Sequence, residues 1–94
     1  MEERSAMMEM PKYRSHKTVW ALKIKALKPQ DTGDDEWDGS YVMTPEEPEY
    51  GPIRLDAAYC EKHEPQVGGY FVVYPDGYKS FSPAGAFESG YTKL

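Results

Sequence analysis

The sequence predicts a single small α+β domain, with an antiparallel sheet of three to five strands and two short helices. Three observations predict this class. The chain has 94 residues, which is the size of one domain. Apolar residues alternate with lysines in its first third, as in a half-buried strand. A hairpin pattern and two short helix patterns follow in the second half.

The first predicted strand covers residues 18–26. Positions 20, 22, 24 and 26 are apolar and share one face, whereas Lys23 and Lys25 fall on the other. We therefore expect one buried face and one lysine-bearing solvent face, which also discourages edge-to-edge pairing. Residues 1–10 are rich in Met and Glu without periodicity, so we expect a disordered N-terminal tail before a folded domain at 11–94.

The stretch 29–52 predicts an acidic loop with one short strand inside it, at 41–44. Its prolines at positions 45, 48 and 52 exclude a helix or a central strand. Another short extended piece is expected at 53–55. Asp56 is a good N-cap for a helix at 57–63, which Pro65 ends.

A hairpin is predicted at 70–81, where aromatic and β-branched residues flank Pro75-Asp76-Gly77. Pro sets φ at the second turn position, and Gly accepts the left-handed conformation. A type I turn with a G1 bulge is the expected connection.

The C-terminal segment predicts a short helix followed by an edge strand. Ser82 is the expected N-cap, and Pro83 is the expected first residue of a helix at 83–89, which Gly90 ends. The predicted core of the domain consists of Trp20, Leu22, Ile24, Phe71, Val73, Phe81 and Phe87. A core of this size is marginal, which favours a homodimer or an obligate partner.

Composition excludes several classes of protein. One cysteine cannot form an internal disulfide, and no apolar run approaches the roughly 20 residues that span a bilayer. We expect no signal peptide in the first residues and no membrane association.

The net charge of −5 is unevenly distributed along the chain. Residues 1–28 carry +4, residues 29–53 carry −8 with eight acids and no base, and residues 54–94 carry −1. We interpret the acidic block as a solvated loop that can meet a basic partner surface. The expected partner-binding residues are Asp31, Asp34, Asp35, Glu36, Trp37, Asp38, Glu46, Glu47, Glu49 and Tyr50.

Two patterns suggest metal or thiol chemistry, and neither is complete. Residues 34–39 begin like a calcium loop, but its twelfth position is Pro45 and helices are not expected on its flanks. Cys60 and His63 share a helix face, yet they form only half of a zinc site and have no evident orienting group or oxyanion site. We predict no catalytic residue, no metal site and no cofactor, and a small metal- or thiol-dependent enzyme remains the third alternative.

Nucleic-acid binding is not expected, although bases and aromatic residues alternate within residues 12–28. Phosphate contacts would have to overcome the field of the acidic block. The eight tyrosines are more numerous than a core of this size needs. They suit either a structural sheet face or a protein interface.

The end of the chain, GGYFVVYPDGYKSFSPAGAFESGYTKL at 68–94, resembles the closing segment of a family of small phage and prophage proteins. Residues 11–27, PKYRSHKTVWALKIKAL, resemble the opening of the same family. This resemblance implies a place in the cytoplasm of a bacterial host but carries no catalytic residue.

Three functions follow from these observations. The first is a non-enzymatic phage accessory protein that binds a host or phage protein with a basic surface, such as an anti-CRISPR-like inhibitor of a host nucleic-acid-binding or defence complex. The second is a virion or morphogenesis component that self-associates. The third, which the sequence does not favour, is a small metal- or thiol-dependent enzyme that would use Cys60 and His63.

Overall fold

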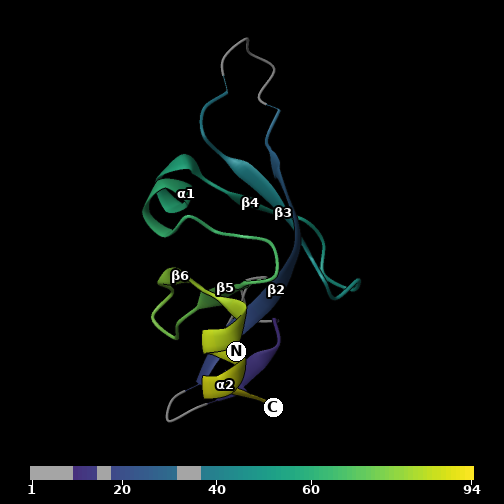
Figure 1. The fold of residues 1–94 in the computed structure, drawn as a ribbon, viewed down its shortest axis with the longest axis vertical. Helices are drawn as coiled ribbons and strands as arrows, with labels where there is room; N and C mark the ends of the chain where they lie inside the picture. The colour runs from purple at the N-terminus through teal and green to yellow at the C-terminus, as the bar shows by residue number, and fades with distance from the viewer. Residues whose placement is uncertain (1–9, 15–17, 32–36) are drawn as a thin grey trace, which may run out of the picture.

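The fold is a seven-stranded antiparallel sheet with two short helices (Figure 1), which confirms the predicted α+β class. A computed structural model describes residues 10–14, 18–31 and 37–94. In these residues the elements are β1 (Lys12–Arg14), β2 (Thr18–Pro29), β3 (Tyr41–Pro45), β4 (Ile53–Leu55), α1 (Ala57–His63), β5 (Tyr70–Val73), β6 (Lys79–Ser82), α2 (Ala84–Gly90) and β7 (Thr92–Lys93). The sheet has more strands than the three to five expected. The strand β7 is the expected edge strand, whereas β1 was not expected because it is too short to produce a clear period-two pattern.

The long strand β2 organises the sheet. Trp20 pairs with Lys12 of β1 on one edge and with Val73 of β5 on the other. Beyond a register shift between Ile24 and Ala26, β2 continues along β3 as far as Pro29. Such a bulge bends a strand, so one half of β2 lies with β1 and β5 and the other half lies with β3 and β4.

Both faces of the first half of β2 are buried, which differs from the expected solvent face. Val19 and Ala21 are fully buried, because the chain returns over this face as α2 and brings Phe87 against it. Lys25 is exposed as expected, and Lys23 is half-buried. After the bulge, Leu27 replaces Ala26 as the residue that packs against the core.

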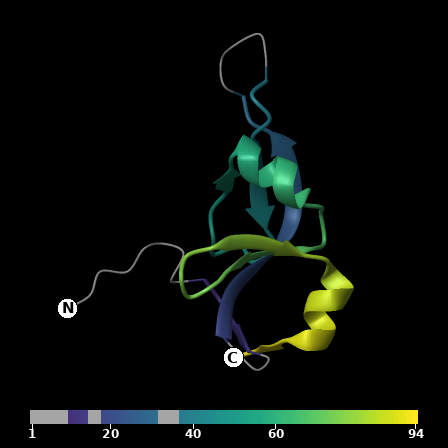
Figure 2. The ribbon, with the colours of Figure 1, turned by 90° about the vertical axis from the view of Figure 1, so that its left-hand side faces the viewer.

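Two apolar clusters result from this arrangement. The larger core lies between the sheet and α1 and is built from Met10, Trp20, Leu22, Ile24, Met43, Leu55, Tyr59, Phe71 and Val73. The smaller core lies under α2 and is built from Val19, Ala21, Tyr70, Val72 and Phe87. Figure 2 shows α1 beside the β3–β4 half of the molecule and α2 beside the other half. All predicted core residues are buried except Phe81, which is half-buried and packs against the larger core.

The two helices begin in different ways. Asp56 caps α1 as predicted, because its side chain accepts a hydrogen bond from the Tyr59 backbone N–H at 2.8 Å. The expected Ser82 cap of α2 is wrong, since Pro83 is the N-cap and makes no side-chain cap bond. Ser82 is the last residue of β6 and pairs with Tyr70 of β5. Its backbone is therefore part of the β5–β6 strand pair and not of the helix start. The last residue of α2 is Gly90.

The hairpin turn has the predicted form. The Gly77 backbone N–H donates to the Tyr74 carbonyl at 2.8 Å, and Gly77 has a φ of 92°. The Asp76 carboxylate accepts a hydrogen bond from the Tyr78 N–H at 2.9 Å. Pro75 and Asp76 therefore occupy the central positions of the turn, with glycine in the left-handed position.

At the N-terminal end of the described chain, Met10 is 4% exposed and belongs to the larger core. The folded part therefore includes Met10, one residue earlier than expected. The rest of the predicted tail, residues 1–9, lies outside the described residues. None of the described helices is long and apolar enough to span a membrane.

The contact between α2 and the sheet predicts a pH dependence of stability. Glu88 accepts hydrogen bonds from the Tyr70 hydroxyl at 2.7 Å and from the Lys23 ammonium at 2.9 Å. These bonds hold the pKa of the Glu88 carboxyl below its ordinary value of 4.5. Their contribution to the free energy of unfolding is therefore fully present above the ordinary pKa of 4.5. It is lost as the pH falls through the lower pKa that Glu88 has in the folded protein.

We expect Glu88→Gln to flatten the acid side of the stability profile. Thermal unfolding followed by circular dichroism between about pH 6 and pH 3 measures this. The melting temperature of Glu88→Gln should approach that of the native chain as the pH falls. A constant difference at every pH would contradict the assignment.

Candidate functional site

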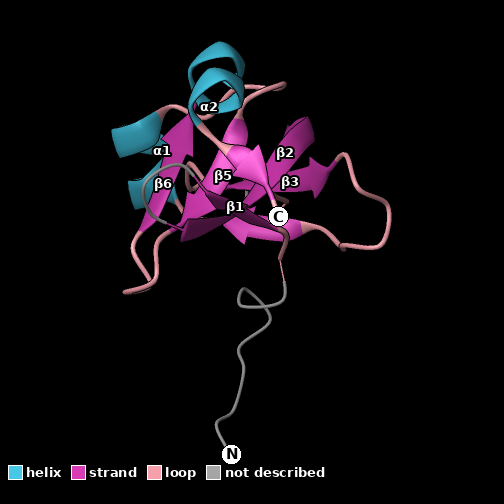
Figure 3. Ribbon diagram, turned by 90° about the horizontal axis from the view of Figure 1, so that it is seen from below, coloured by secondary structure: helices cyan, strands magenta, loops and turns pink. Residues whose placement is uncertain are grey.

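The acidic stretch is divided between the two ends of β3. Asp31, Trp37 and Asp38 lie beyond the β2–β3 end of the molecule, and Asp34, Asp35 and Glu36 lie outside the described residues. Glu46, Glu47, Glu49 and Tyr50 lie on the β3–β4 connection, on the side of the molecule opposite α1 (Figure 3). The described members of the predicted binding set thus belong to two separate places.

Asp38 stabilises the chain just before β3, at the end of the molecule where β2 ends and β3 begins. Its carboxylate accepts hydrogen bonds from the Ser40 hydroxyl at 2.6 Å and from the Ser40 N–H at 2.9 Å. Arg54 approaches the other carboxylate oxygen at 3.5 Å. The bonds from Ser40 lower the pKa of the Asp38 carboxyl. Because Ser40 is fully buried, this network fixes the chain where it enters β3.

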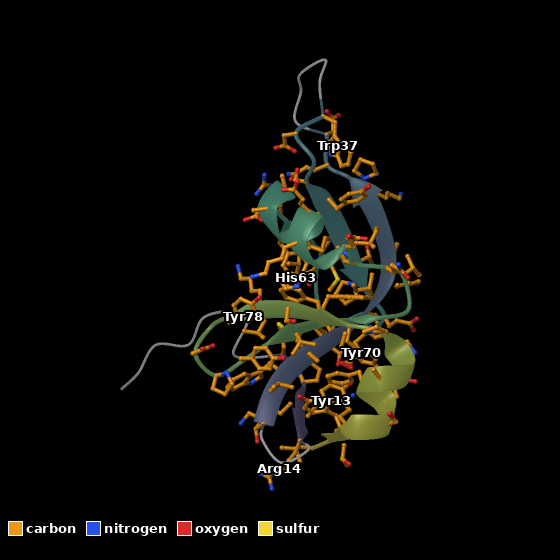
Figure 4. The ribbon with its side chains drawn as sticks, turned by 60° about the vertical axis from the view of Figure 1, so that its left-hand side comes forward. Tyr13, Arg14, Trp37, His63, Tyr70 and Tyr78 are labelled. Atoms are coloured by element: carbon orange, nitrogen blue, oxygen red, sulfur yellow. The ribbon has the colours of Figure 1, made fainter. Side chains whose placement is uncertain are left out.

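Trp37 is held in place although its side chain is exposed. Its indole N–H donates to the Ser40 carbonyl at 2.6 Å, and its ring meets Tyr41 edge-on with a centroid distance of 5.0 Å. The residue is nevertheless 47% exposed, and it lies at the end of the molecule near α1 (Figure 4). An exposed aromatic ring with a fixed orientation is well suited to contact another protein.

The β3–β4 group contributes mainly to the fold. Glu47 forms an ion pair with Lys93 of β7 at 3.1 Å. The Glu46 backbone N–H donates to the Lys23 carbonyl and extends the β2–β3 ladder. Tyr50 packs against the larger core, whereas Glu49 is exposed. Glu46 is exposed as well, so the accessible carboxylates of this group are those of Glu46 and Glu49.

A groove follows α1 along the β2–β3 half of the molecule. It consists of two hollows, of about 390 Å³ and 430 Å³, which share Tyr41 and Cys60 in their walls. We call it the α1 groove, and its main lining residues are Leu27, Trp37, Tyr41, Cys60, Glu61 and Glu64. Of the residues that line the groove, sequence reasoning assigned Trp37 and Asp38 to binding.

Cys60 and His63 contact different neighbours. The Cys60 thiol donates to the Leu55 carbonyl at 3.5 Å, and burial raises its pKa. The His63 ring packs on Tyr59 and Tyr78, with centroid distances of 4.7 Å and 5.9 Å, and burial lowers its pKa. A protonated thiol is a weak nucleophile. Among the described residues, no three His, Cys, Asp or Glu side chains converge as metal ligands do.

Five of the eight tyrosines form two groups, and Figure 4 shows Tyr13 and Tyr70 of one group on a different part of the molecule from Tyr78 of the other. Tyr13, Tyr70 and Tyr91 pack around Phe87 in and beside the smaller core. Tyr74 and Tyr78 stack on each other at the hairpin tip with a centroid distance of 6.0 Å. Tyr78 is 45% exposed. The first group is structural. In the second group Tyr74 also packs against the smaller core, so Tyr78 is the exposed member of the pair.

The comparisons with known proteins give one informative result. No family model matches the chain, and no curated protein matches it. The fold is similar to the NMR solution structure of the monomeric form of the phage L decoration protein, with a TM-score of 0.65 and 29% sequence identity. The match covers 98% of this chain and 65% of that protein. The chain therefore spans a little less than two thirds of the length of the decoration protein.

Proposed function

We propose that this chain is a structural accessory protein of a phage particle that binds to the capsid as a decoration protein does. The observation that carries the proposal is the similarity to the phage L decoration protein over 98% of the chain. The resemblance of residues 11–27 and 68–94 to a phage and prophage family points to the same setting, from the sequence alone.

The described surface supports a role in contact. Trp37 leaves nearly half of its surface exposed, and large aromatic side chains are favoured anchors in protein interfaces. The raised pKa of Cys60 keeps its thiol protonated at neutral pH, which disfavours thiol catalysis. These features and the decoration-protein similarity support a non-enzymatic role.

Of the two binding roles considered for the sequence, the virion component is the one that the comparison favours. The inhibitor role depended on one continuous acidic surface, but the described acids are divided between the two ends of β3. The similarity to a decoration protein offers nothing in favour of a host-defence target. We therefore place the partner on the particle.

The protein content of purified particles tests the proposal. We expect the chain to remain with particles of the phage that encodes it through a density gradient, in many copies per particle, as measured by quantitative mass spectrometry. Particles from a phage with the gene deleted serve as the control. Recovery of the chain only in the soluble lysate would contradict a virion role.

A further inference from the structure

We propose that the α1 groove is the surface that docks on the capsid, and that it receives a coat-protein segment with Lys or Arg beside an apolar side chain. This inference rests on the proposed function and specifies the contact through which it acts.

The shape of the groove provides space for an apolar side chain. Leu27, Tyr41 and Cys60 are half-buried and form apolar parts of its walls. The two hollows adjoin through Tyr41 and Cys60, so the groove is elongated along α1. Each hollow, at about 390 Å³ and 430 Å³, is as large as the smaller ligand sites of proteins. An extended segment can therefore place successive side chains in them.

Trp37 gives the groove a fixed anchor at one end. Its bond to the Ser40 carbonyl and its edge contact with Tyr41 fix the ring before any partner arrives. A preorganised side chain loses little conformational entropy on binding. Because 47% of Trp37 is exposed, a partner can still bury a large apolar area against it.

The charges around the groove select a basic partner. Among the described residues that line it are three carboxylates, those of Asp38, Glu61 and Glu64, and no base. Arg54 approaches Asp38 at 3.5 Å, and the Lys62 ammonium lies 5.2 Å from the Tyr78 ring. Glu61 and Glu64 are exposed and form no ion pair with another described residue. Lys or Arg on the partner would complement these two carboxylates.

The backbone conformation at Glu64 is unusual for a residue with a side chain. Glu64 ends α1 with a φ of 48°, in the left-handed region. Glycine is the usual residue at such a helix end, because a side chain is unfavourable there. A non-glycine residue in a strained conformation is often found where its side chain serves a function. The Glu64 side chain lines the groove, where the proposed contact would use it.

Binding of purified variants to capsids from the gene-deleted phage, measured by co-sedimentation, tests the inference. Trp37→Ala should weaken binding at least tenfold. Glu61→Lys combined with Glu64→Lys should weaken it about tenfold at low salt, and the loss should shrink at high salt. Glu64→Gly should weaken binding while its unfolding temperature stays equal to or above that of the native chain.

The controls are matched to the variants in exposure and charge. Tyr78→Ala removes an aromatic ring that is 45% exposed, against 47% for Trp37, and lies outside the groove. Glu46→Lys combined with Glu49→Lys reverses two exposed charges on the β3–β4 connection. Both control variants should bind as the native chain does.

The outcomes separate this inference from the proposed function. If the native chain does not bind gene-deleted capsids, the proposed function fails. If the native chain binds and the groove variants bind equally well, the inference alone fails. If light scattering shows that the groove variants change the oligomeric state of the free protein, the groove is an interface between copies and the inference is overturned.

Discussion

Phe87→Ala is expected to lower the free energy of unfolding by about 3–5 kcal/mol, as is typical when a large buried aromatic side chain is removed. Phe87 is the buried residue of α2. Its ring stacks on Tyr70 and Tyr91, with centroid distances of 4.2 Å and 4.5 Å, and meets Tyr13 edge-on at 4.8 Å. A chain of this size has a total stability of about 5–14 kcal/mol, so the expected loss is a large part of it.

Urea unfolding followed by circular dichroism measures the effect of Phe87→Ala. Phe81→Ala is the matched control, because it deletes the same side chain from a half-buried position. Its loss should be clearly smaller. A loss below about 1 kcal/mol for Phe87→Ala would mean that α2 does not hold the smaller core together.

Gly69→Ala is expected to destabilise the fold by at least about 3 kcal/mol, at or above the upper end of typical overpacking losses. A methyl group at this position would collide with the Phe81 ring and would lie 2.9 Å from the Ser82 carbonyl oxygen. The backbone cannot easily move away, because the Gly69 carbonyl accepts a hydrogen bond from Ile24 of β2 at 2.8 Å. The space beside this residue is therefore filled by β6.

Gly51→Ala is the matched control for this substitution. A methyl group at Gly51 meets no atom within 4 Å, so its effect on the unfolding midpoint in urea should be within about 0.5 kcal/mol. Equal midpoints for Gly69→Ala and the native chain would contradict the close packing of β6 against Gly69.

Local sequence features predicted much of the fold. The Pro75-Asp76-Gly77 turn, the Asp56 cap and the strands at 41–44 and 53–55 depend on neighbouring residues, and the structure contains all of them. Tertiary features were not predictable in this way. The burial of Val19 and Ala21 depends on α2, which is distant in sequence.

The candidate site was predicted less completely than the fold. Trp37 and Asp38 stood out because they lie in an acidic block without a base. Glu61 and Glu64 belong to a helix end that carries mixed charge, so their neighbours in sequence gave no signal. Glu61 and Glu64 line the same groove as Trp37 only because α1 packs beside β3. A helix that ends at Glu64 without glycine was the sequence feature that could have drawn attention to this end of α1.

Cryo-electron microscopy of particles with and without this chain tests the central claim most directly. The difference map between native and gene-deleted particles should show density on the outer surface of the capsid, repeated on the lattice and of a size that fits a 10.7 kDa domain. The α1 groove should face the coat protein in that density. Identical maps for particles known to differ only in this gene would contradict the account.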